Sequence, residues 1–497
     1  MPRPRRVTCV PLLLLPPLRR EIVAPALRLA RLLGALPVLD VRGDVDGVEV
    51  SDVTHDSSAV VPGSLYCCLR GAHRDGHDFA ADAVGAGATA LLVERPLDLT
   101  ADVAQVVVAD ARRSMASLSA ALHGHPSRTS LRVVGITGTN GKTTTTFLVR
   151  AILEAAGIPT GVLGTMTGSR TTPEAPVLQA TLARFAAEGK RAAAIEVSSM
   201  GLVQRRVDAT WFAAAIFTNL SQDHLDDHGS MEAYFEAKAS LFTPERTAVG
   251  IVNVDDSHGR RLFERATVEM RPYAMTDAVD LELGVGSSTF RWDGVRVDLP
   301  LDGAYNVSNA LAAATAAREL GIAPDAVAAG LSSVGVITGH GEAVDAGQDF
   351  RVVVDYAHTP LALTSVLQAA RSAAGERGRV LVVFGCGGRR DPSKRAPMGW
   401  AASSTADVVV VTSDNPRDED PEAIISAVVD GATGGAQVLV EPDRRAAIAT
   451  AFARASAGDV VVIAGKGHET GQTIGDTVVP FDDRAVAIQL LSGRSSS

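Results

Sequence analysis

The chain has 497 residues, of which 46% are hydrophobic and 21% charged, and its net charge is −10. That length predicts roughly two to four globular domains. The acidic balance and the lack of a long Lys/Arg run argue against nucleic-acid or anionic-membrane binding, so we expect neither a nucleic-acid partner nor membrane insertion.

The N-terminal residues MPRPRRVTCVPLLLLPPLRR hold a short apolar run that prolines interrupt. We expect no secretory signal there, and no stretch of the sequence approaches the roughly 18–20 apolar residues of a membrane span. The chain has four cysteines, Cys9, Cys67, Cys68 and Cys386. None of them forms a C-x-x-C motif, and their spacing predicts no disulfide framework. A reduced, cytoplasmic setting is the expectation.

Apolar strand-like runs alternate with helical stretches along the chain, which predicts an α/β fold. The first predicted domain, residues 25–128, ends at the polar linker HGHPSRTS. The second, residues 129–338, opens with the strand LRVVGIT and closes near the helix NVSNALAAATAARELG. The third, residues 339–492, contains FRVVVDYA, RVLVVFGCGG, ADVVVVTSDN and GDVVVIAGKG. Such near-continuous runs suit parallel strands that are buried on both faces, with binding residues at their carboxyl ends.

The stretch GTNGKTT follows the first strand of the second domain and precedes a helix. A strict P-loop has glycine five residues before the Gly-Lys pair, where this chain has Ile136, so the loop is a shortened G-x-x-G-K-T. Gly138 and Gly141 let the backbone approach an anion, Lys142 supplies charge, and Thr143 can ligate Mg²⁺. The context favours a phosphate-binding loop over an ordinary strand-to-helix turn.

Two acidic features follow in the same domain. Glu196 ends the strand AAAIE and is a candidate Mg²⁺ ligand. The alternative is a glutamate at a strand end that faces solvent. Five polar residues then crowd the segment NLSQDHLDDHG: Asp223, His224, Asp226, Asp227 and His228. A zinc hydrolase helix would need Glu where Leu225 stands, and Gly229 ends any helix. A divalent-metal or phosphate site, or a structural histidine pair, remains open.

Nine motifs occur in one order along the chain: GTNGKTT, EVSS, NLSQDHLDDHG, YFEAK, YNVSNAL, VDYAHTP, GCGGRRDPSKR, SDNPR and GKGHE. Together they resemble the Mur ligases, and within them most closely the diaminopimelate-adding type. The resemblance implies three domains: a UDP-sugar-binding domain, a central P-loop ATPase-like parallel sheet, and a C-terminal Rossmann-like domain. It also implies an ADP-forming ligase of peptidoglycan precursor synthesis, with ATP and Mg²⁺, that activates a peptide carboxylate as an acyl phosphate.

The resemblance assigns roles position by position. Lys142, Lys238 and His224 are expected in catalysis. The ATP-binding set is Gly138, Thr139, Asn140, Gly141, Lys142, Thr143, Thr144, Asn306, Asn309, Asp355 and His358. The metal-binding set is Thr143, Glu196, His224 and, once carbamylated, Lys238. Without the family, Lys238 is expected to be a solvated helix lysine, and the asparagines and Asp355 are expected to be cap or turn residues.

The expected substrates are UDP-MurNAc-L-Ala-D-Glu and an amino acid. Residues matching the nucleotide-sugar site are Ser57, Thr171, Thr172, Ser198, Gln204 and Arg206, although serine and threonine are often turn or cap residues. Those matching the amino-acid site are Arg390, Asp414, Asn415, Pro416, Arg417, Gly465 and Glu469. An arginine at 417 can hold a carboxylate bidentately, which favours meso-diaminopimelate over lysine. We expect a monomer.

Three positions depart from the family pattern. Met200 stands where histidine is usual, His340 where a hinge arginine is expected near the ATP phosphates, and Arg389 where aspartate is usual. Histidine carries a less certain charge at pH 7 than arginine. Two alternatives therefore stay open: a paralogous ligase that uses another amino acid or carboxylate, and a nucleotide-binding protein that has lost catalysis.

Overall fold

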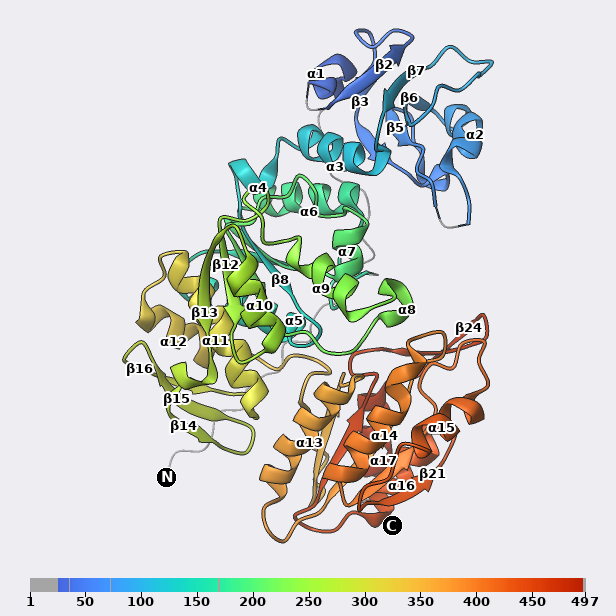
Figure 1. The fold of residues 1–497 in the computed structure, drawn as a ribbon. Helices are drawn as coiled ribbons and strands as arrows, with labels where there is room; N and C mark the ends of the chain where they lie inside the picture. Colours follow the sequence, from blue (N-terminus) through green and yellow to red (C-terminus); the bar gives the residue numbers. More distant parts are fainter. Residues whose placement is uncertain (1–25, 35, 72, 169, 495–497) are drawn as a thin grey trace. The chain divides into compact units, whose positions relative to one another are not determined.

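The computed structural model describes the chain except residues 1–25, 35, 72, 169 and 495–497 (Figure 1). The described residues form two compact units. The first comprises residues up to Pro126 with Leu163–Arg184 and Arg205–Val207, and the second comprises Ser127–Val162, Phe185–Gln204 and Asp208 onward. The boundaries 25–128, 129–338 and 339–492 stay a prediction, since two units are a coarser division. The proline-interrupted N-terminal run and Cys9 lie outside the described residues.

The first unit is built on a five-stranded sheet of order β2-β7-β6-β5-β4, parallel except for the β2–β7 pair. Leu65, Leu92 and Val106 from three of its strands are buried with Met115 and Leu118 of α3. Its elements are β1 (Leu27–Arg28), α1 (Leu29–Leu33), β2 (Val38–Arg42), β3 (Glu49–Val50), β4 (Asp52–Thr54), η1 (Ser57–Ala59), β5 (Ser64–Cys67), η2 (Gly76–Phe79), α2 (Ala80–Gly85), β6 (Ala88–Val93), β7 (Ala104–Val108) and α3 (Ala111–Leu122).

The second unit opens on a six-stranded sheet of order β13-β12-β11-β8-β10-β9, here called the central sheet. The strand predicted from LRVVGIT is β8, and it pairs in parallel with β10 and β11. The strands and the helices that follow them along the chain are α4 (Pro126–Thr129), β8 (Arg132–Thr137), α5 (Lys142–Ala155), β9 (Thr160–Leu163), α6 (Ala175–Ala187), β10 (Ala192–Glu196), α7 (Ser199–Val203), β11 (Ala214–Phe217), α8 (Leu225–His228), α9 (Met231–Ala239), β12 (Val249–Asn253), α10 (Ser257–Arg265) and β13 (Glu269–Tyr273). Most of α6 belongs to the first unit.

An antiparallel sheet, β14-β15-β16, and two helices complete this part of the chain. The small sheet has no counterpart among the predicted elements, although Phe290, Trp292, Val297 and Leu299 show the two-residue alternation of a half-buried strand pair. The elements are η3 (Met275–Asp277), β14 (Val279–Leu283), β15 (Ser288–Trp292), β16 (Val295–Leu299), α11 (Ala304–Glu319) and α12 (Pro324–Ser332).

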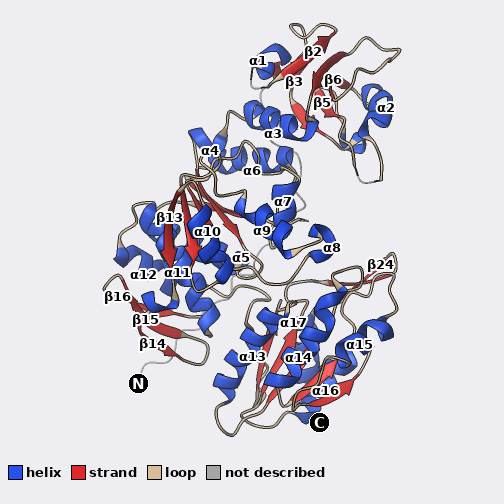
Figure 2. Cartoon of the chain, viewed as in Figure 1, coloured by secondary structure: helices blue, strands red, loops and turns tan. Residues whose placement is uncertain are grey.

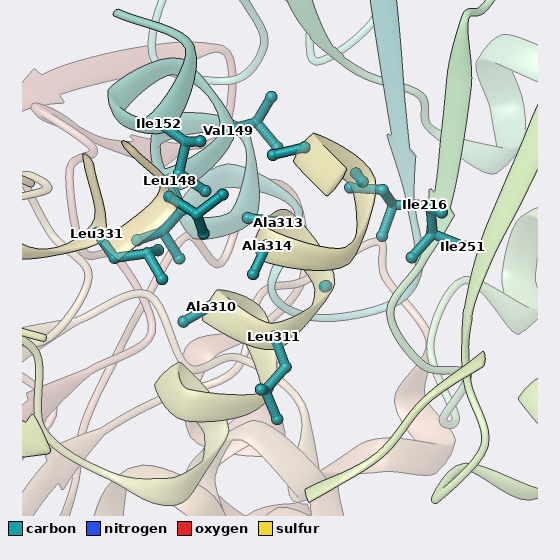
Figure 3. Close-up of a cluster of buried hydrophobic side chains, with 14 of the residues drawn as sticks. Leu148, Val149, Ile152, Ile216, Ile251, Ala310, Leu311, Ala313, Ala314 and Leu331 are labelled. Carbon is teal, nitrogen blue, oxygen red and sulfur yellow. The ribbon is translucent and has the colours of Figure 1, made fainter. Parts of the chain in front are cut away.

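The alanine-rich helix α11 is buried because its small side chains allow close packing on several sides. Figure 3 shows Leu148 and Ile152 of α5 gathered with Ala313 and Ala314 of α11 and with Leu331 of α12. This cluster fixes α5, and with it the phosphate loop, against the sheet.

The last part of the second unit is a six-stranded sheet of order β17-β18-β22-β19-β20-β21, here called the C-terminal sheet. Its four predicted apolar runs are the parallel strands β18, β19, β20 and β22, and β17 is antiparallel at the edge. Helices cover both faces: α13, α14 and α15 pack in one buried cluster, and α16 and α17 in another (Figure 2). The α/β class with parallel sheets is therefore confirmed.

The bounds in this part of the chain are β17 (Glu342–Val344), β18 (Arg351–Asp355), α13 (Pro360–Ala374), β19 (Val380–Phe384), η4 (Pro392–Lys394), α14 (Arg395–Thr405), β20 (Val408–Val411), α15 (Pro421–Val429), β21 (Gln437–Val440), α16 (Arg444–Arg454), β22 (Val460–Ala464), β23 (Gly471–Ile474), β24 (Thr477–Pro480) and α17 (Asp483–Arg494). Strands β23 and β24 form a hairpin. Across the described ranges, no helix is long and apolar enough to cross a membrane.

The contact between α5 and α12 generates a stability prediction. A Cβ atom at Gly330 would lie 2.8 Å from the backbone nitrogen of Ile152 and 2.9 Å from the carbonyl oxygen of Ala151, and backbone atoms cannot rotate away. We expect Gly330→Ala to destabilise the second unit by about 1–3 kcal/mol, since overpacking outweighs the gain in helix propensity. The measurement is the thermal midpoint. Gly335→Ala, where a Cβ meets open space, is the matched control, and equal midpoints for the two variants would contradict the packing argument.

Candidate active site

The phosphate loop joins the end of β8 to the start of α5. Gly138 and Gly141 have φ values of +149° and +83°, which side chains rarely tolerate, and a Cβ at Gly138 would collide with the hydroxyl of Thr218. The loop backbone is anchored to the end of β11: the Asn140 amide donates to Asn219 Oδ1 at 3.0 Å. The Thr139 hydroxyl lies 3.2 Å from Tyr234 Oη, and Thr144 is buried in the first turn of α5.

Two lysines converge on this loop. The ammonium of Lys142 donates to the carbonyls of Gly138 and Thr139 at 3.0 and 2.9 Å. The ammonium of Lys238, on α9, donates to the same Gly138 carbonyl at 2.8 Å and lies 4.6 Å from the centre of the Tyr234 ring. Lys238 is only 1% exposed. Burial lowers the pKa of both amines, and for Lys238 the neighbouring charge of Lys142 lowers it further.

Oxygen ligands lie next to the first turn of α5. The Thr143 hydroxyl donates to Glu196 Oε1 at 3.0 Å, and Glu196 is 2% exposed at the end of β10. Glu196 is thus turned into the protein, so the solvent-facing alternative is wrong. A hydroxyl and a carboxylate in this arrangement are the donor types that Mg²⁺ takes from proteins.

The two histidines of the NLSQDHLDDHG segment face different partners. His228 Nε2 lies 2.9 Å from the Ser199 hydroxyl, and its ring lies over Tyr234 at 4.9 Å between centres. His224 has a φ of +55° and lies 3.4 Å from both Asp223 Oδ2 and Asp227 Oδ2. His228 is therefore held as a structural histidine. Among the described residues, one cluster of three or more His, Cys, Asp or Glu side chains lies close enough together to hold a metal ion, and it consists of His224, Asp226 and Asp227.

The predicted nucleotide residues lie along α11 and at the end of β18. The Asn309 side chain accepts from the Thr145 hydroxyl and donates to Asn306 Oδ1, both at 3.4 Å, and Asn306 donates to the Asp302 carbonyl at 2.9 Å. Asp355 accepts from the amides of Gly341 and Ala357 at 2.6 and 2.7 Å, while burial raises the pKa of its carboxyl to about 6.

His340 lies in an aromatic cluster where the second unit connects its two large sheets. Its ring stacks on His468 with 5.8 Å between centres and meets Tyr356 edge to face. Burial is the main cause that lowers the pKa of His340 to about 3, and the positive charges nearby lower it further. At pH 7 this side chain is neutral, so it does not supply the positive charge that an arginine would bring.

The predicted amino-acid residues gather at the carboxyl ends of β19, β20 and β22. Arg417 has a φ of +54°, and its Nη1 donates to the carbonyl of Gly388 at 2.5 Å. Among the described residues its guanidinium forms no ion pair with a carboxylate. Arg390 is exposed, and a Cβ atom on Gly387 would lie 3.1 Å from Nη1 of Arg417 and 3.6 Å from Cγ of Arg390. Two neighbouring arginines suit a ligand carboxylate.

Acidic and basic side chains pair with one another after the ends of β20 and β22. Glu469 Oε2 accepts from Lys466 at 2.9 Å and from Asn415 at 2.8 Å, and Asn415 also donates to Asp414 Oδ1 at 2.8 Å. A Cβ at Gly465 would lie 2.7 Å from Asp414 Oδ2, so only glycine fits beside that carboxylate. Pro416 follows in the same loop.

The residues predicted to contact the nucleotide sugar belong to both units and are described separately. In the first unit, Arg206 pairs with Glu174 at 2.9 Å and donates to the carbonyl of Thr172 at 3.0 Å, while the Thr171 hydroxyl lies 3.0 Å from that of Thr165. Ser57 begins η1. In the second unit, Ser198 caps α7 by accepting from the Gly201 amide, and Gln204 follows that helix. Their ligand roles stay a prediction.

Three polar residues without a predicted role are built into the site. Asp223 and Lys394 are 4% and 6% exposed and form an ion pair, and Lys466 is fully buried against Glu469. Lysines in loops are ordinarily solvated, so the motifs DPSKR and GKGHE gave no local signal that these two are buried. Arg389, one of the departures from the family pattern, forms an exposed ion pair with Asp418.

Comparison with known proteins finds three family models along the chain. Residues 49–125 match the Mur ligase family catalytic domain, residues 136–317 the Mur ligase middle domain, and residues 341–467 the Mur ligase glutamate ligase domain. The matched ranges together span most of the described residues, and they contain the phosphate loop and both arginines near Gly387.

Relatives and solved structures agree with these models. The UDP-N-acetylmuramoyl-L-alanyl-D-glutamate–2,6-diaminopimelate ligase of Streptomyces coelicolor is 46% identical over 477 residues, covering 90% of this chain and 94% of the relative. A solved structure of a ligase with that name is 32% identical, with a TM-score of 0.66, covering 94% of this chain and 99% of the other. The ligase MurF of Thermotoga maritima in complex with ADP shares the fold at 19% identity, with a TM-score of 0.62, covering 90% and 98%.

The neutral His340 generates a pH prediction. The unfolded chain takes up this proton near the ordinary histidine pKa of 6.5, and the folded chain takes it up near 3. Stability is therefore full above pH 6.5 and is lost as the pH falls towards 3. We expect His340→Gln to flatten the dependence of the thermal midpoint on pH between 6.5 and 4. His73→Gln, at an exposed histidine, is the control. A His340→Gln slope equal to that of the unchanged protein would refute the assignment.

Proposed function

The chain belongs to the Mur ligase family, and we propose that it joins meso-diaminopimelate to UDP-MurNAc-L-Ala-D-Glu with conversion of ATP to ADP and phosphate. The observation that supports this most is that one unit holds both a phosphate loop contacted by two lysines and a pair of arginines near Gly387. These are the two sites that an ATP-dependent amide ligase needs. A peptidoglycan precursor pathway draws on ATP and nucleotide sugars, so we place the enzyme in the cytoplasm.

We assign the first chemical step to the loop. An oxygen of the D-Glu carboxylate forms a bond to the γ-phosphorus as the bond to the ADP oxygen breaks, giving an acyl phosphate and ADP. Lys142 and Lys238 would face the phosphoryl oxygens, where negative charge is concentrated, while the amides at the start of α5 hold the neighbouring phosphates. Asn306, Asn309, Asp355 and His358 would hold the rest of the nucleotide.

Mg²⁺ fits the side chains next to the loop. The buried Thr143 hydroxyl and Glu196 carboxylate are hard oxygen donors at 3.0 Å from each other, and His224 lies in the segment that follows β11. These three residues, with Lys238 once it carries a carbamate, would hold the ion. When bound, the ion neutralises phosphate charge.

The second step belongs to the C-terminal sheet. The neutral amine of the amino acid forms a C–N bond to the acyl carbon, the C–O bond to phosphate breaks, and the amine proton leaves with the phosphate. Arg417 and Arg390 would pair with the distal carboxylate of diaminopimelate, and Glu469 with its distal ammonium. Lysine lacks that carboxylate and would leave a partly buried arginine unpaired, which is costly.

The test is ADP release with ATP, Mg²⁺ and UDP-MurNAc-L-Ala-D-Glu, with meso-diaminopimelate, with L-lysine, and with no amino acid. We expect release that requires diaminopimelate, and an Arg417→Met variant whose KM for diaminopimelate rises about 10²-fold while that for ATP stays constant. Release with lysine alone would leave the paralogous ligase as the interpretation. No release from protein that binds ATP would favour lost catalysis, with His340→Arg the first reversion to make.

The lowered pKa of Lys238 generates a prediction about modification. A neutral amine attacks the carbon of CO₂ to form an N–C bond, and loss of a proton leaves a carbamate, which would add an oxygen ligand beside Glu196. We expect a carbamate carbon signal in the NMR spectrum of protein equilibrated with ¹³C-bicarbonate at pH 8, together with activation by bicarbonate. Lys238→Met should remove the signal. The absence of a carbamate carbon signal at saturating bicarbonate would overturn the assignment.

A further inference from the structure

One ion pair joins the C-terminal sheet to the central sheet. Lys394 ends η4, next to α14, and its ammonium lies 3.2 Å from Oδ1 of Asp223, which follows β11 of the central sheet. The two residues are 6% and 4% exposed, so both charges are nearly removed from water. Neither residue belongs to the predicted nucleotide, sugar or amino-acid sets.

Burying such a pair is a poor route to stability. Desolvation of the two ions offsets most of their attraction, and apolar residues of similar volume often stabilise as well or better. A buried ion pair does fix geometry, because a misplaced partner leaves an unpaired charge. The ion pair is therefore better suited to fixing the relative position of the two sheets than to raising the net stability of the fold.

Both carboxylate oxygens of Asp223 have partners. Its other oxygen, Oδ2, lies 3.4 Å from His224 Nε2 and 3.5 Å from His358 Nε2, and His358 donates from Nδ1 to its own neighbour, the Tyr356 carbonyl, at 2.8 Å. The two histidines and Lys394 thus surround this carboxylate with nitrogen-bearing partners from both sheets.

Two further hydrogen bonds join the sheets beside this pair. The Gln222 amide donates to the Ser393 hydroxyl at 2.6 Å, and the Thr359 hydroxyl donates to Oδ1 of Asn140 in the phosphate loop at 3.2 Å. The backbone amide of Ser393 in turn donates to Oδ1 of Asp391 at 2.9 Å. All these contacts lie within two residues of the loop, of Asp223 or of Lys394.

We propose that Lys394 is a positioning residue, whose ion pair with Asp223 latches the C-terminal sheet against the phosphate loop. The latch places the arginines near Gly387 of the C-terminal sheet opposite the carboxylate that the loop activates. Lys394 acts through Asp223 and does not touch the reacting atoms. The catalytic consequence rests on the proposed ligase function, whereas the conformational consequence does not.

The conformational test uses spin labels on the full chain without ligand. Labels go on Glu264→Cys in α10 and Gln368→Cys in α13, both exposed, with Cys9→Ser, while Cys67, Cys68 and Cys386 are buried and unreactive. We expect a single narrow distance distribution, and for Lys394→Met a broader one that extends to longer distances. Arg389→Gln is the matched control. It removes a cation from the same loop as Lys394, but the partner of Arg389, Asp418, also belongs to the C-terminal sheet. Equal distributions for Lys394→Met and the control would overturn the latch.

The activity test is a double-mutant cycle on ADP release. We expect Lys394→Met and Asp223→Asn each to lower kcat by about 10²-fold, the cost of a small misplacement, with the KM for ATP changed much less. The double variant should lose no more than the worse single variant, and Lys394→Arg should restore part of kcat. Additive losses would show that Lys394 acts independently of Asp223 and overturn the proposal. If the unchanged enzyme releases no ADP, the ligase assignment fails, and the distance measurement still decides the latch.

Discussion

The carbonyl oxygen of Gly138 accepts hydrogen bonds from two ammonium groups, those of Lys142 and Lys238. Burial lowers the pKa of both amines, and the charge of Lys142 lowers that of Lys238 further. Two amines that meet at one buried point make the site favourable for an anion. The rest of the second unit keeps this arrangement in place. Gly138 has no side chain to obstruct the approach, α5 is fixed by its packing on α11 and α12, and Lys238 reaches the loop from α9.

Two carboxylates near the phosphate loop have different partners. Glu196 is bonded to Thr143 and faces the start of α5, while Asp223 is surrounded by His224, His358 and Lys394. Asp223 thus receives partners from both large sheets of the unit. A carboxylate shared in this way couples the position of the C-terminal sheet to the charge distribution at the phosphate loop, which is the physical basis of the latch.

A second buried ion pair supports the loops that carry the predicted amino-acid residues. Arg444 and Asp483 are both fully buried, and Arg444 also donates to the carbonyls of Ser413 and Ala464 at 3.4 and 3.0 Å. Those carbonyls belong to the chain at the ends of β20 and β22, the strands that lead into Asp414 and Gly465. The loops that carry the predicted ligand residues are therefore tied to a rigid part of the fold, as precise recognition of a small zwitterion requires.

The sequence by itself determined the α/β class, the buried parallel strands and the phosphate loop, because these depend on local patterns: apolar runs, glycine spacing, and a lysine at the start of a helix. It also predicted that Glu196 ends a strand and that Arg417 lies in the loop after a strand, as the structure has them, because strand ends carry the binding residues of parallel sheets. Their ligand roles stay predictions. Only the tertiary structure decided that Lys238 and Lys394 are buried, that His224 and His228 face different partners, and that His340 stacks on His468. The reason is physical. Burial and charge pairing depend on residues distant in sequence, such as Asp223 and Lys394, and no local pattern records which of them meet.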